Sequence, residues 1–283
     1  MHDDYSDLRP SPIAGSWYSA NPTKLRMSIE KFLSDATPPD ITGEIIALIV
    51  PHAGHVYSGL TAAHAFRLVE NKTYERVIVV SPSHQYYHQP ILTSGHQAYK
   101  TPLGVIPIDQ AGVEVVNQGL MKIADTKLAQ VRHDQEHSIE IELPFLQVAL
   151  SKPFSLVPIM LRDQSAPLAQ VLGLALADLA KADSTLLIAS TDLSHFYTES
   201  VANRLDKSIL GALEAFSLRK LYNLASSGEG QACGLGAMAA VMWAALELGA
   251  DKITVVDYRT SAYVTHDKSS VVGYAAAVIM KTT

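Results

Sequence analysis

Short apolar runs of the kind that form buried strands alternate along this chain with segments of helical spacing. The run IIALIV at 45–50 is followed by a helical pattern at 59–70 and by a second run, RVIVVS, at 76–81. A strand, a helix and a strand within about 35 residues have the size of a βαβ unit. Because such a crossover makes its two strands parallel, the pattern predicts an α/β fold: a central, largely parallel (mixed) sheet with helices on both faces.

The same alternation continues to the end of the chain. Further strands are expected at 104–108, 155–161, 184–190, 253–258 and 271–280, and helices at 22–36, 111–123, 137–150, 166–182 and 234–249, with two more helical patterns up to residue 226. No stretch has the composition of a linker between domains. We therefore predict a single domain over residues 1–283, in which 1–10 form a loosely ordered N-terminal extension.

Charge and cysteine content narrow the choice of partners. The net charge is −6 and no block of Lys or Arg occurs, so we expect no nucleic-acid partner and no membrane partner. The first ten residues, MHDDYSDLRP, are acidic and polar, unlike a signal or transit peptide. The one cysteine, Cys233, cannot form an internal disulfide. Together these features lead us to expect a cytoplasmic protein.

Three of the predicted strands end at a turn that carries a histidine. His52 follows the run at 45–50, His84 the run at 76–81, and His195 the run at 184–190. Ligands of open α/β sheets bind beyond the carboxyl ends of the strands. If the first two strands are neighbours, His52 and His84 lie at one edge and could share a metal ion. A single histidine at such a place is more simply a turn cap, but three at equivalent places favour a site.

Cys233 lies just before a long apolar helical pattern, in QACGLGAMAAVMWAALELG. The positive end of a helix dipole lowers the pKa of a thiol, so we expect a lowered pKa for Cys233. The alternative is a small buried hydrophobic residue, which is the usual state of a free cysteine. Gly234 and Gly236 favour the first interpretation, because they allow the backbone to approach another group closely.

The segment HDQEHSIEIELP at 133–144 is dense in acidic and imidazole side chains. If it is helical, Glu136 and His137 both lie near Glu140. The segment does not contain the H-E-x-x-H pattern and so does not indicate a metalloprotease. Glu136 and His137 are the better candidates for a functional role, and a solvated acidic helix start is an equally good explanation.

Two aromatic-containing stretches lie outside the predicted strands. GSWYSA at 15–20 carries Trp17, and HVYSG at 55–59 carries His55 and Tyr57. Aromatic side chains in such places can wall a pocket for a substrate, and they can equally be ordinary packing.

Seven segments, in this order, resemble the Memo family, which includes the AmmeMemoRadiSam system protein B of archaea and bacteria. They are AGSWY, PHAGHVYSG, SPSH, EHSIEIELPFL, STDLSH, ACG before an apolar helix, and DKSSVVGYAAA. The resemblance extends from about residue 10 to the C-terminus. It implies a fold similar to that of the class III extradiol ring-cleaving dioxygenases, which are non-haem Fe(II) enzymes.

The resemblance also implies roles for individual residues. His52, His84 and Cys233 match the proposed ligands of one iron or copper ion per chain. Asp192 and His195 match other polar residues of the pocket, and His195 falls where the dioxygenases keep a general acid/base.

Outside the ligands, Trp17 matches the aromatic residue at the mouth of the pocket. His55 stands where the family usually has a tyrosine. Eukaryotic members are adaptors in receptor signalling, for which a phosphotyrosine peptide has been proposed as ligand. A small-molecule or peptide ligand in the His/Cys pocket is the partner that the resemblance implies.

One feature separates this pattern from the dioxygenases. Those enzymes hold iron with two histidines and a carboxylate, whereas Cys233 offers a thiolate here, which favours Cu(I), Zn or thiolate-tolerant iron. A shared fold does not establish ring cleavage.

Three functions therefore remain open. The first is a metal-dependent redox enzyme in which His195, oriented by Asp192, moves a proton, while Glu136 and His137 support the ligands or face the substrate. The second is a non-catalytic module that binds a phosphorylated or acidic peptide through the imidazoles and Trp17. The third is a zinc hydrolase.

Overall fold

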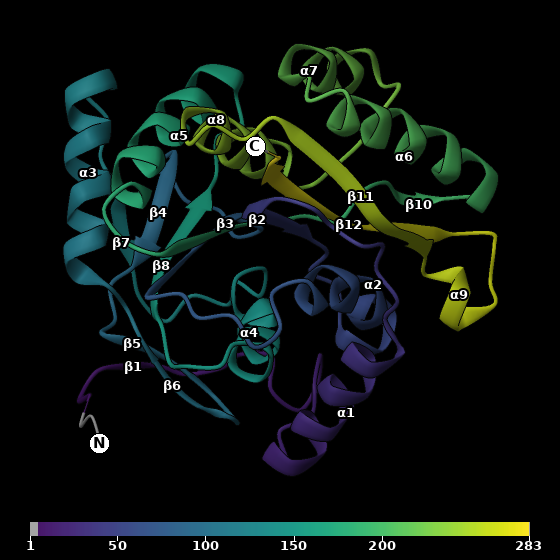
Figure 1. Ribbon diagram of the computed structural model, residues 1–283, viewed down its shortest axis with the longest axis horizontal. Helices are drawn as coiled ribbons and strands as arrows, with labels where there is room; N and C mark the ends of the chain where they lie inside the picture. Colours follow the sequence, from purple (N-terminus) through teal and green to yellow (C-terminus); the bar gives the residue numbers. More distant parts are fainter. Residues whose placement is uncertain (1–4, 283) are drawn as a thin grey trace.

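The computed structural model describes residues 5–282, which form an α/β fold around a nine-stranded mixed sheet (Figure 1). The order in the sheet is β10-β12-β2-β9-β3-β8-β4-β7, and β11 pairs with β12. The strands of this sheet are β2 (Glu44–Val50), β3 (Arg76–Pro82), β4 (Ile91–Ser94), β7 (Ala129–Val131), β8 (Ser155–Leu161), β9 (Thr185–Ser190), β10 (His195–Tyr197), β11 (Lys252–Thr260) and β12 (Val271–Lys281). A second, small sheet has the order β1-β5-β6, with β1 (Leu8–Arg9), β5 (Ala98–Thr101) and β6 (Gly104–Pro107).

The predicted α/β architecture is confirmed. Strands β2, β9, β3 and β8 are parallel neighbours, and their apolar residues are buried on both faces. Strand β12 is antiparallel to β2, and β4 is antiparallel to β8, so the sheet as a whole is mixed. The short strands β1, β4, β5, β7 and β10 were not predicted, because two to four residues are too few for a clear apolar pattern.

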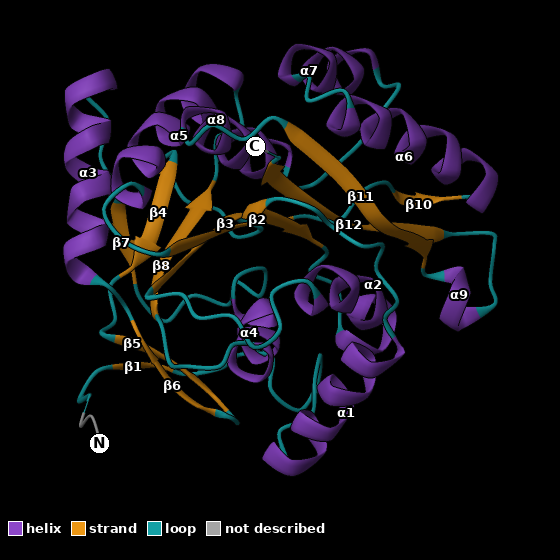
Figure 2. Ribbon diagram, viewed as in Figure 1, coloured by secondary structure: helices purple, strands orange, loops and turns teal. Residues whose placement is uncertain are grey.

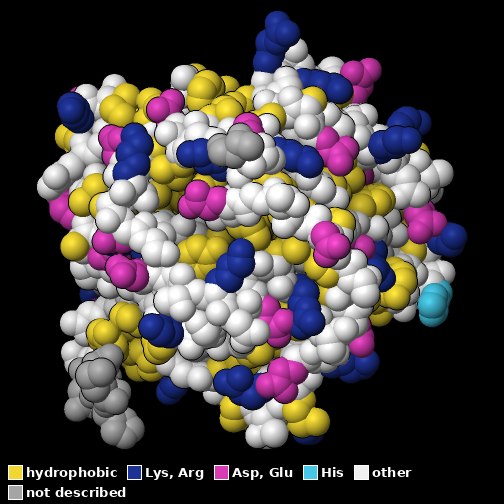
Figure 3. Space-filling view, viewed as in Figure 1, with side chains coloured by type: hydrophobic (Ala, Val, Ile, Leu, Met, Phe, Trp, Pro, Cys, Tyr) yellow, Lys and Arg dark blue, Asp and Glu magenta, His cyan; other side chains and the backbone are white. Residues whose placement is uncertain are grey.

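Helices cover both faces of the sheet (Figure 2). One face carries α1 (Pro22–Asp35), α2 (His55–Arg67) and α4 (Leu143–Ala149), and the other carries α3 (Gln110–Ala124), α5 (Ala166–Ala180) and α8 (Leu235–Glu247). Helix α6 (Glu199–Glu214) lies beside β11, and α7 (Leu218–Ser227) packs against α6 and α8. Helix α9 (Ala262–Thr265) is a single turn after β11. No helix in residues 5–282 has both the length and the apolarity needed to cross a bilayer. Figure 3 shows acidic and basic side chains interspersed over one face of the molecule.

Two helices begin several residues away from their predicted starts. Helix α2 begins at His55 rather than at residue 59. The prediction missed the first turn because Val56 and Tyr57 are exposed there and interrupt the apolar spacing. The helix predicted at 137–150 begins only at Glu140, as the 3₁₀ turn η1 (Glu140–Glu142), and α4 follows from Leu143. A proline in the first turn of α4 suits that position, since no intrahelical donor is lost there.

The predicted loose extension at 1–10 is wrong for the residues that form β1. Strand β1 pairs with β5, and Arg9 is only 2% exposed. Its guanidinium forms ion pairs of 2.7 Å with both Asp134 and Glu140. Residues 1–4 of the extension lie outside the described part of the chain.

His55, the first residue of α2, has a buried side chain that does not face the solvent. Its ring packs against Phe145 and Tyr18, with centroid distances of 4.9 Å and 5.4 Å. Nε2 lies 3.0 Å from the carbonyl oxygen of Ile141, so it carries the proton and donates it. Burial lowers the pKa of His55 to about 4, against the smaller opposing effect of the bond to Ile141. The prediction that His55 contacts a substrate has no support from this placement.

Helices α5 and α8 lie close together at Gly173. A Cβ atom added there would lie 2.4 Å from Cβ of Trp243 and 2.7 Å from the carbonyl oxygen of Ala240. Such distances are below any van der Waals contact, so the glycine sets the separation of the two helices.

We expect Gly173→Ala to lower the free energy of unfolding by about 1–3 kcal/mol, because the methyl group forces the two helices apart. The measurement is urea unfolding followed by circular dichroism. Gly211→Ala in α6 is the matched control, since an added Cβ there meets no atom within 4 Å. The control should be neutral or stabilising by up to about 1 kcal/mol. Equal effects of the two substitutions would contradict the proposed helix contact.

We expect His55 to make the stability depend on pH. In the unfolded chain its pKa is about 6.5, so the unfolded state takes up the proton first as the pH falls. The contribution of neutral His55 is therefore complete above about pH 6.5 and is lost toward pH 4, by about 2 kcal/mol between pH 7 and pH 5. Urea unfolding at both pH values should show this slope in the wild type and a smaller slope in His55→Phe. His88→Gln, which changes an exposed histidine, should keep the wild-type slope.

Candidate metal site

The candidate site lies where three parallel strands end. Strand β9 pairs with β2 on one side and with β3 on the other, so the segments after all three leave the sheet at one edge. His52, Asp192 and His84 are each the second residue after β2, β9 and β3, respectively. From the sequence, we expected a shared site if β2 and β3 were neighbouring strands. They are not neighbours, because β9 lies between them.

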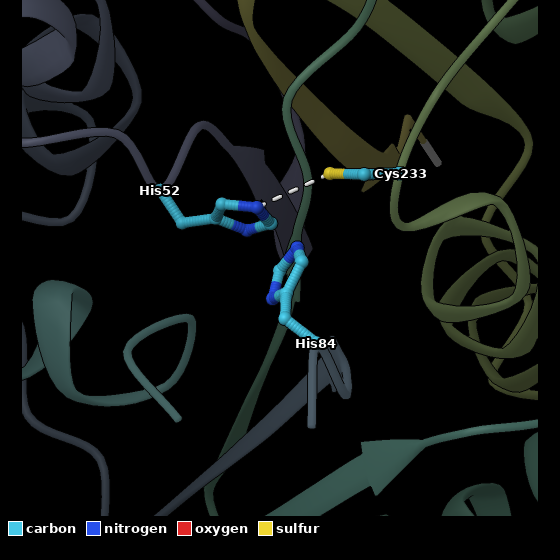
Figure 4. A group of neighbouring side chains, drawn as sticks. All are labelled: His52, His84 and Cys233. Atoms are coloured by element: carbon cyan, nitrogen blue, oxygen red, sulfur yellow. Dashed lines mark hydrogen bonds between the residues drawn. The ribbon is translucent and has the colours of Figure 1, made fainter. Parts of the chain in front are cut away.

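The rings of His52 and His84 nevertheless lie close together (Figure 4). Their centroids are 5.2 Å apart, and their planes are nearly perpendicular at 85°. The backbone N–H of His52 donates a 2.8 Å hydrogen bond to Oδ1 of Asp192. This bond connects the turn after β2 to the turn after β9 and so fixes the position of the His52 backbone, from which the ring projects.

Cys233 reaches the site from the segment before α8. Its backbone N–H donates to the carbonyl oxygen of Asp192 at 3.1 Å, and the N–H of Gly234 donates to Oγ1 of Thr191 at 2.9 Å. A Cβ on Gly234 would lie 2.6 Å from the carbonyl oxygen of Ser190, so only glycine allows this approach. The result is that Sγ of Cys233 lies 3.1 Å from Nε2 of His52.

His52, His84 and Cys233 form a group that could hold one metal ion. One ring nitrogen from each histidine and the sulfur all lie within 4.8 Å of one another. Two imidazoles and a thiolate are donors suited to zinc, copper and iron, and poor donors for Mg²⁺ or Ca²⁺. The donor set therefore fits the ions that the sequence resemblance implied.

The expected lowering of the Cys233 pKa is not found. Burial of the thiol raises its pKa well above the ordinary value, and the nearby carboxyl of Asp192 adds to this effect. The N–H of Asp192 donates to Sγ at 3.2 Å, which opposes the shift without reversing it. The expectation gave most weight to the dipole of α8, which lowers the pKa of the thiol. The loss of water around the sulfur raises this pKa by more. A bound cation reverses this balance, since a coordinating thiol loses its proton.

Glu136 binds the ring nitrogen Nδ1 of His84 and so orients the imidazole. Its Oε1 lies 2.9 Å from Nδ1 of His84 and accepts hydrogen bonds from the backbone N–H groups of His137 and Ser138. Burial opposes the charge on Glu136, but the bonds from His84 lower the pKa overall. Burial of the His84 ring lowers its pKa, but the hydrogen bond to Glu136 and the charge of Glu136 raise it overall. A carboxylate on Nδ1 directs Nε2 toward the cavity, as in many histidine–metal sites.

The loop that carries Glu136 is shaped by Arg9. The guanidinium donates to the carbonyl oxygen of Glu136 at 2.6 Å, in addition to its ion pairs with Asp134 and Glu140. Residues 136 and 137 are therefore not on a helix, and their predicted proximity to Glu140 along a helix face is wrong. Arg9 was not among the residues singled out from the sequence, since an arginine near the chain start carries no local signal of burial.

His137 adds a third imidazole beside the group. Its ring stacks on His84, with 4.6 Å between centroids, and contacts Trp17 in a tilted arrangement, with 4.2 Å between centroids and 38° between the planes. His137, His84 and Glu136 form a second possible ligand group, which shares His84 with the first. Trp17 is thus packed against one side of the histidine cluster.

A cavity of about 380 Å³ opens over the imidazoles of His52, His84 and His137. The predicted residues that line it are Trp17, Tyr57, His137, Asp192 and His195, together with His52 and His84. His55, Glu136 and Cys233 are not part of this wall. Ser16, Val56, Val272 and Tyr274 also line it and were not predicted. Val56 and Tyr274 gave no signal, because an apolar side chain on a helix or a strand is ordinarily part of the core.

Asp192 does not orient His195, contrary to the expectation. Nδ1 of His195 lies 2.8 Å from the carbonyl oxygen of Leu193, and Asp192 instead accepts from the backbone of His52. A carbonyl only accepts, so Nδ1 of His195 carries the proton and Nε2 is left as an acceptor. Burial raises the pKa of Asp192 to about 7.

Most imidazoles of the cluster are held neutral. Burial lowers the pKa of His52 well below its ordinary value, and burial lowers that of His137 to about 4. Burial also lowers the pKa of His195. These rings therefore offer lone pairs rather than positive charge at neutral pH, with His84 as the exception.

A solved structure has the same overall fold. It is the crystal structure of uncharacterized protein JW3007 from Escherichia coli K12, which aligns with a TM-score of 0.59 over 83% of this chain and 100% of its own. The sequence identity is 14%, so the likeness concerns the fold.

Sequence comparisons cover nearly the whole chain. A MEMO1 family protein of Nitrosopumilus maritimus is 34% identical over 274 residues, covering 95% of this chain and 98% of its own length. A MEMO1 family protein of Methanosarcina acetivorans is 32% identical over 276 residues, covering 96% and 99%. The family model for Memo-like protein matches residues 9–278, and the chain therefore belongs to the Memo-like protein family.

Proposed function

We propose that the pocket formed by His52, His84 and Cys233 binds one iron or copper ion and that the chain is a metal-dependent redox protein. The observation that carries the proposal is the convergence of two imidazole nitrogens and one sulfur within 4.8 Å of one another. These side chains come from two strand ends and a helix start that are far apart in sequence. A small molecule or a peptide side chain is the ligand that we expect in the cavity above them.

The donor set supports copper, iron or zinc over Mg²⁺ and Ca²⁺, and the family resemblance favours iron or copper among them. A sulfur donor selects against Mg²⁺ and Ca²⁺, and imidazole suits copper and iron. When bound, such an ion supplies one-electron or O₂ chemistry. Zinc is the ion that would turn the same ligands toward hydrolysis.

The protein groups around the ligands support proton transfer. His195 faces the cavity with Nδ1–H bonded to Leu193, so Nε2 is free to accept a proton from a bound molecule. The lowered pKa of His195 keeps that nitrogen unprotonated near pH 7. Trp17 and Tyr57 line the cavity and offer flat surfaces against which a ligand can be oriented.

The anion-binding alternative has weaker support. A site for a phosphorylated or acidic peptide needs positive charge, and His52, His137 and His195 are held neutral by burial. His84 has a raised pKa, but its charge is already paired with Glu136. Binding of phosphate would therefore require a pH well below the ordinary pKa of histidine.

Metal binding should depend on His84 and not on His88, which is exposed in the same loop. We expect wild type to bind about one equivalent of Cu(I) or Fe(II) under anaerobic conditions. His84→Ala and Cys233→Ala should each weaken binding by at least about tenfold, because each removes one of three donors. His88→Ala is the matched control and should bind as wild type does. The measurement is anaerobic titration against a chromophoric chelator, with elemental analysis of the purified proteins.

Two results would overturn this proposal. One is a wild-type protein that binds neither ion although it is folded. The other is equal affinity in His84→Ala and His88→Ala. Zinc in the protein as purified, in preference to iron and copper offered together, would favour the hydrolase instead.

Glu136→Gln should weaken metal binding by about 10–100-fold without unfolding the protein, because the carboxylate that orients His84 is lost. Both carboxylate oxygens of Glu136 accept from His84, Oε1 from Nδ1 and Oε2 from the backbone N–H. Glutamine has only one accepting oxygen, so its NH₂ group faces an N–H donor at one of the two places. Glu114→Gln, at an exposed position of α3, controls for the change of net charge. Unchanged affinity in Glu136→Gln would show that the contact between Glu136 and His84 does not prepare the ligand.

A further inference from the structure

Two buried side chains lie behind His52, on the side of its ring away from Cys233. Nδ1 of His52 lies 2.9 Å from Oγ of Ser190, the last residue of β9. The same hydroxyl lies 2.9 Å from Oε1 of Glu142 and 2.7 Å from the carbonyl oxygen of Ser138. Glu142 is 1% exposed, and neither it nor Ser190 was singled out from the sequence.

The three contacts of Ser190 can be satisfied in only one way. A hydroxyl has one proton to donate and two lone pairs that accept. The carbonyl of Ser138 can only accept, so the proton of Ser190 goes to it across 2.7 Å. The remaining two contacts must then be donations to Ser190, one from Nδ1–H of His52 and one from a carboxylic acid proton on Glu142. An ionised Glu142 would compete with Ser138 for one proton, and one buried acceptor would be left without a donor.

We propose that Glu142 is a positioning residue for His52. In its protonated, uncharged form it donates to Ser190, and Ser190 in turn keeps the proton of His52 on Nδ1, with the Nε2 lone pair directed at Cys233 and the cavity. The arrangement of protons stands on the contacts around Ser190. Its consequence for metal binding rests on the function proposed above.

The surroundings of Glu142 agree with an uncharged carboxyl. Burial raises its pKa well above the ordinary value, which outweighs the hydrogen bond with Ser190, and the carboxyl of Asp192 adds to the rise. The described residues 5–282 place no Lys, Arg or His in an ion pair with Glu142. A buried carboxyl without a cationic partner is less costly neutral than charged.

The other nitrogen of His52 fits the same arrangement. Nε2 lies 3.1 Å from Sγ of Cys233, whose pKa is raised by burial. A neutral thiol donates its proton to the Nε2 lone pair. Protons then point in one consistent direction from Cys233 through His52 and Ser190 to the carbonyl of Ser138. The lone pair of Nε2 is the form that a metal ion needs, so the protein prepares His52 as a ligand before the metal arrives.

The first test reads the protons in metal-free, full-length protein at pH 7. Infrared difference spectra between wild type and Glu142→Gln should show a carboxylic acid C=O band in wild type that the variant lacks. Two-bond ¹H–¹⁵N NMR should show His52 protonated on Nδ1 in both proteins, because the amide of glutamine also donates to Ser190. Ser190→Ala removes the acceptor of Nδ1–H and should shift the tautomer of His52.

Two outcomes of this first test overturn the proposal. A difference spectrum without an acid band means that Glu142 is ionised. A His52 protonated on Nε2 in wild type means that the lone pair faces Ser190 rather than the cavity.

The second test measures Cu(I) affinity by anaerobic competition. Glu142→Leu and Ser190→Ala should weaken binding by about tenfold or more, whereas the conservative Glu142→Gln should restore it to within about threefold of wild type. A Glu142→Gln protein that binds as weakly as Glu142→Leu contradicts a neutral Glu142. If no protein binds Cu(I), the metal function fails, while the infrared and NMR results still decide the proton arrangement.

Discussion

The parallel pairing of β9 with both β2 and β3 is the constraint on which the site depends. Parallel strands end at a common edge of the sheet. This edge brings together His52, Asp192 and His84, each two positions beyond its strand, although they are far apart in sequence. The hydrogen bond from the His52 backbone to Asp192 then fixes one turn against the other. Because β9 is buried on both faces between its neighbours, this spacing cannot change without opening the core of the sheet.

Buried carboxyl groups behind the imidazoles decide how the rings are presented. Glu136 is charged and holds Nδ1 of His84, and Arg9 holds the loop from which Glu136 projects. Glu142, in the arrangement proposed here, is neutral and acts on His52 through Ser190. The two carboxyls differ in their surroundings: Glu136 has an imidazole and several N–H groups around it, whereas among residues 5–282 the Glu142 carboxyl is hydrogen-bonded only to the hydroxyl of Ser190. The same residue type thus directs two histidines toward one point by two different means.

Desolvation is also the effect that separates the possible functions of the pocket. It keeps His52, His137 and His195 neutral, and neutral imidazoles bind metal ions rather than phosphate. It likewise keeps the thiol of Cys233 protonated until a cation is present, so binding a metal ion releases a proton from the sulfur. Membership of the Memo-like family and the α/β fold are consistent with several activities, and the chemistry of these few side chains is what narrows them.

Much of the fold follows from local patterns in the sequence, whereas the site depends on contacts between distant segments. The alternation of apolar runs and helical spacing predicted the α/β sheet, and the histidines after 45–50 and 76–81 pointed to its edge. The sequence alone did not reveal the position of β9 between β2 and β3, the loop form of 136–139, or the burial of Arg9 and Glu142. Periodicity reports which face of an element is apolar, because that property belongs to neighbouring residues. Strand order, the loss of water around Cys233 and the partners of a buried carboxyl are set by residues far along the chain, and only the tertiary structure decided them.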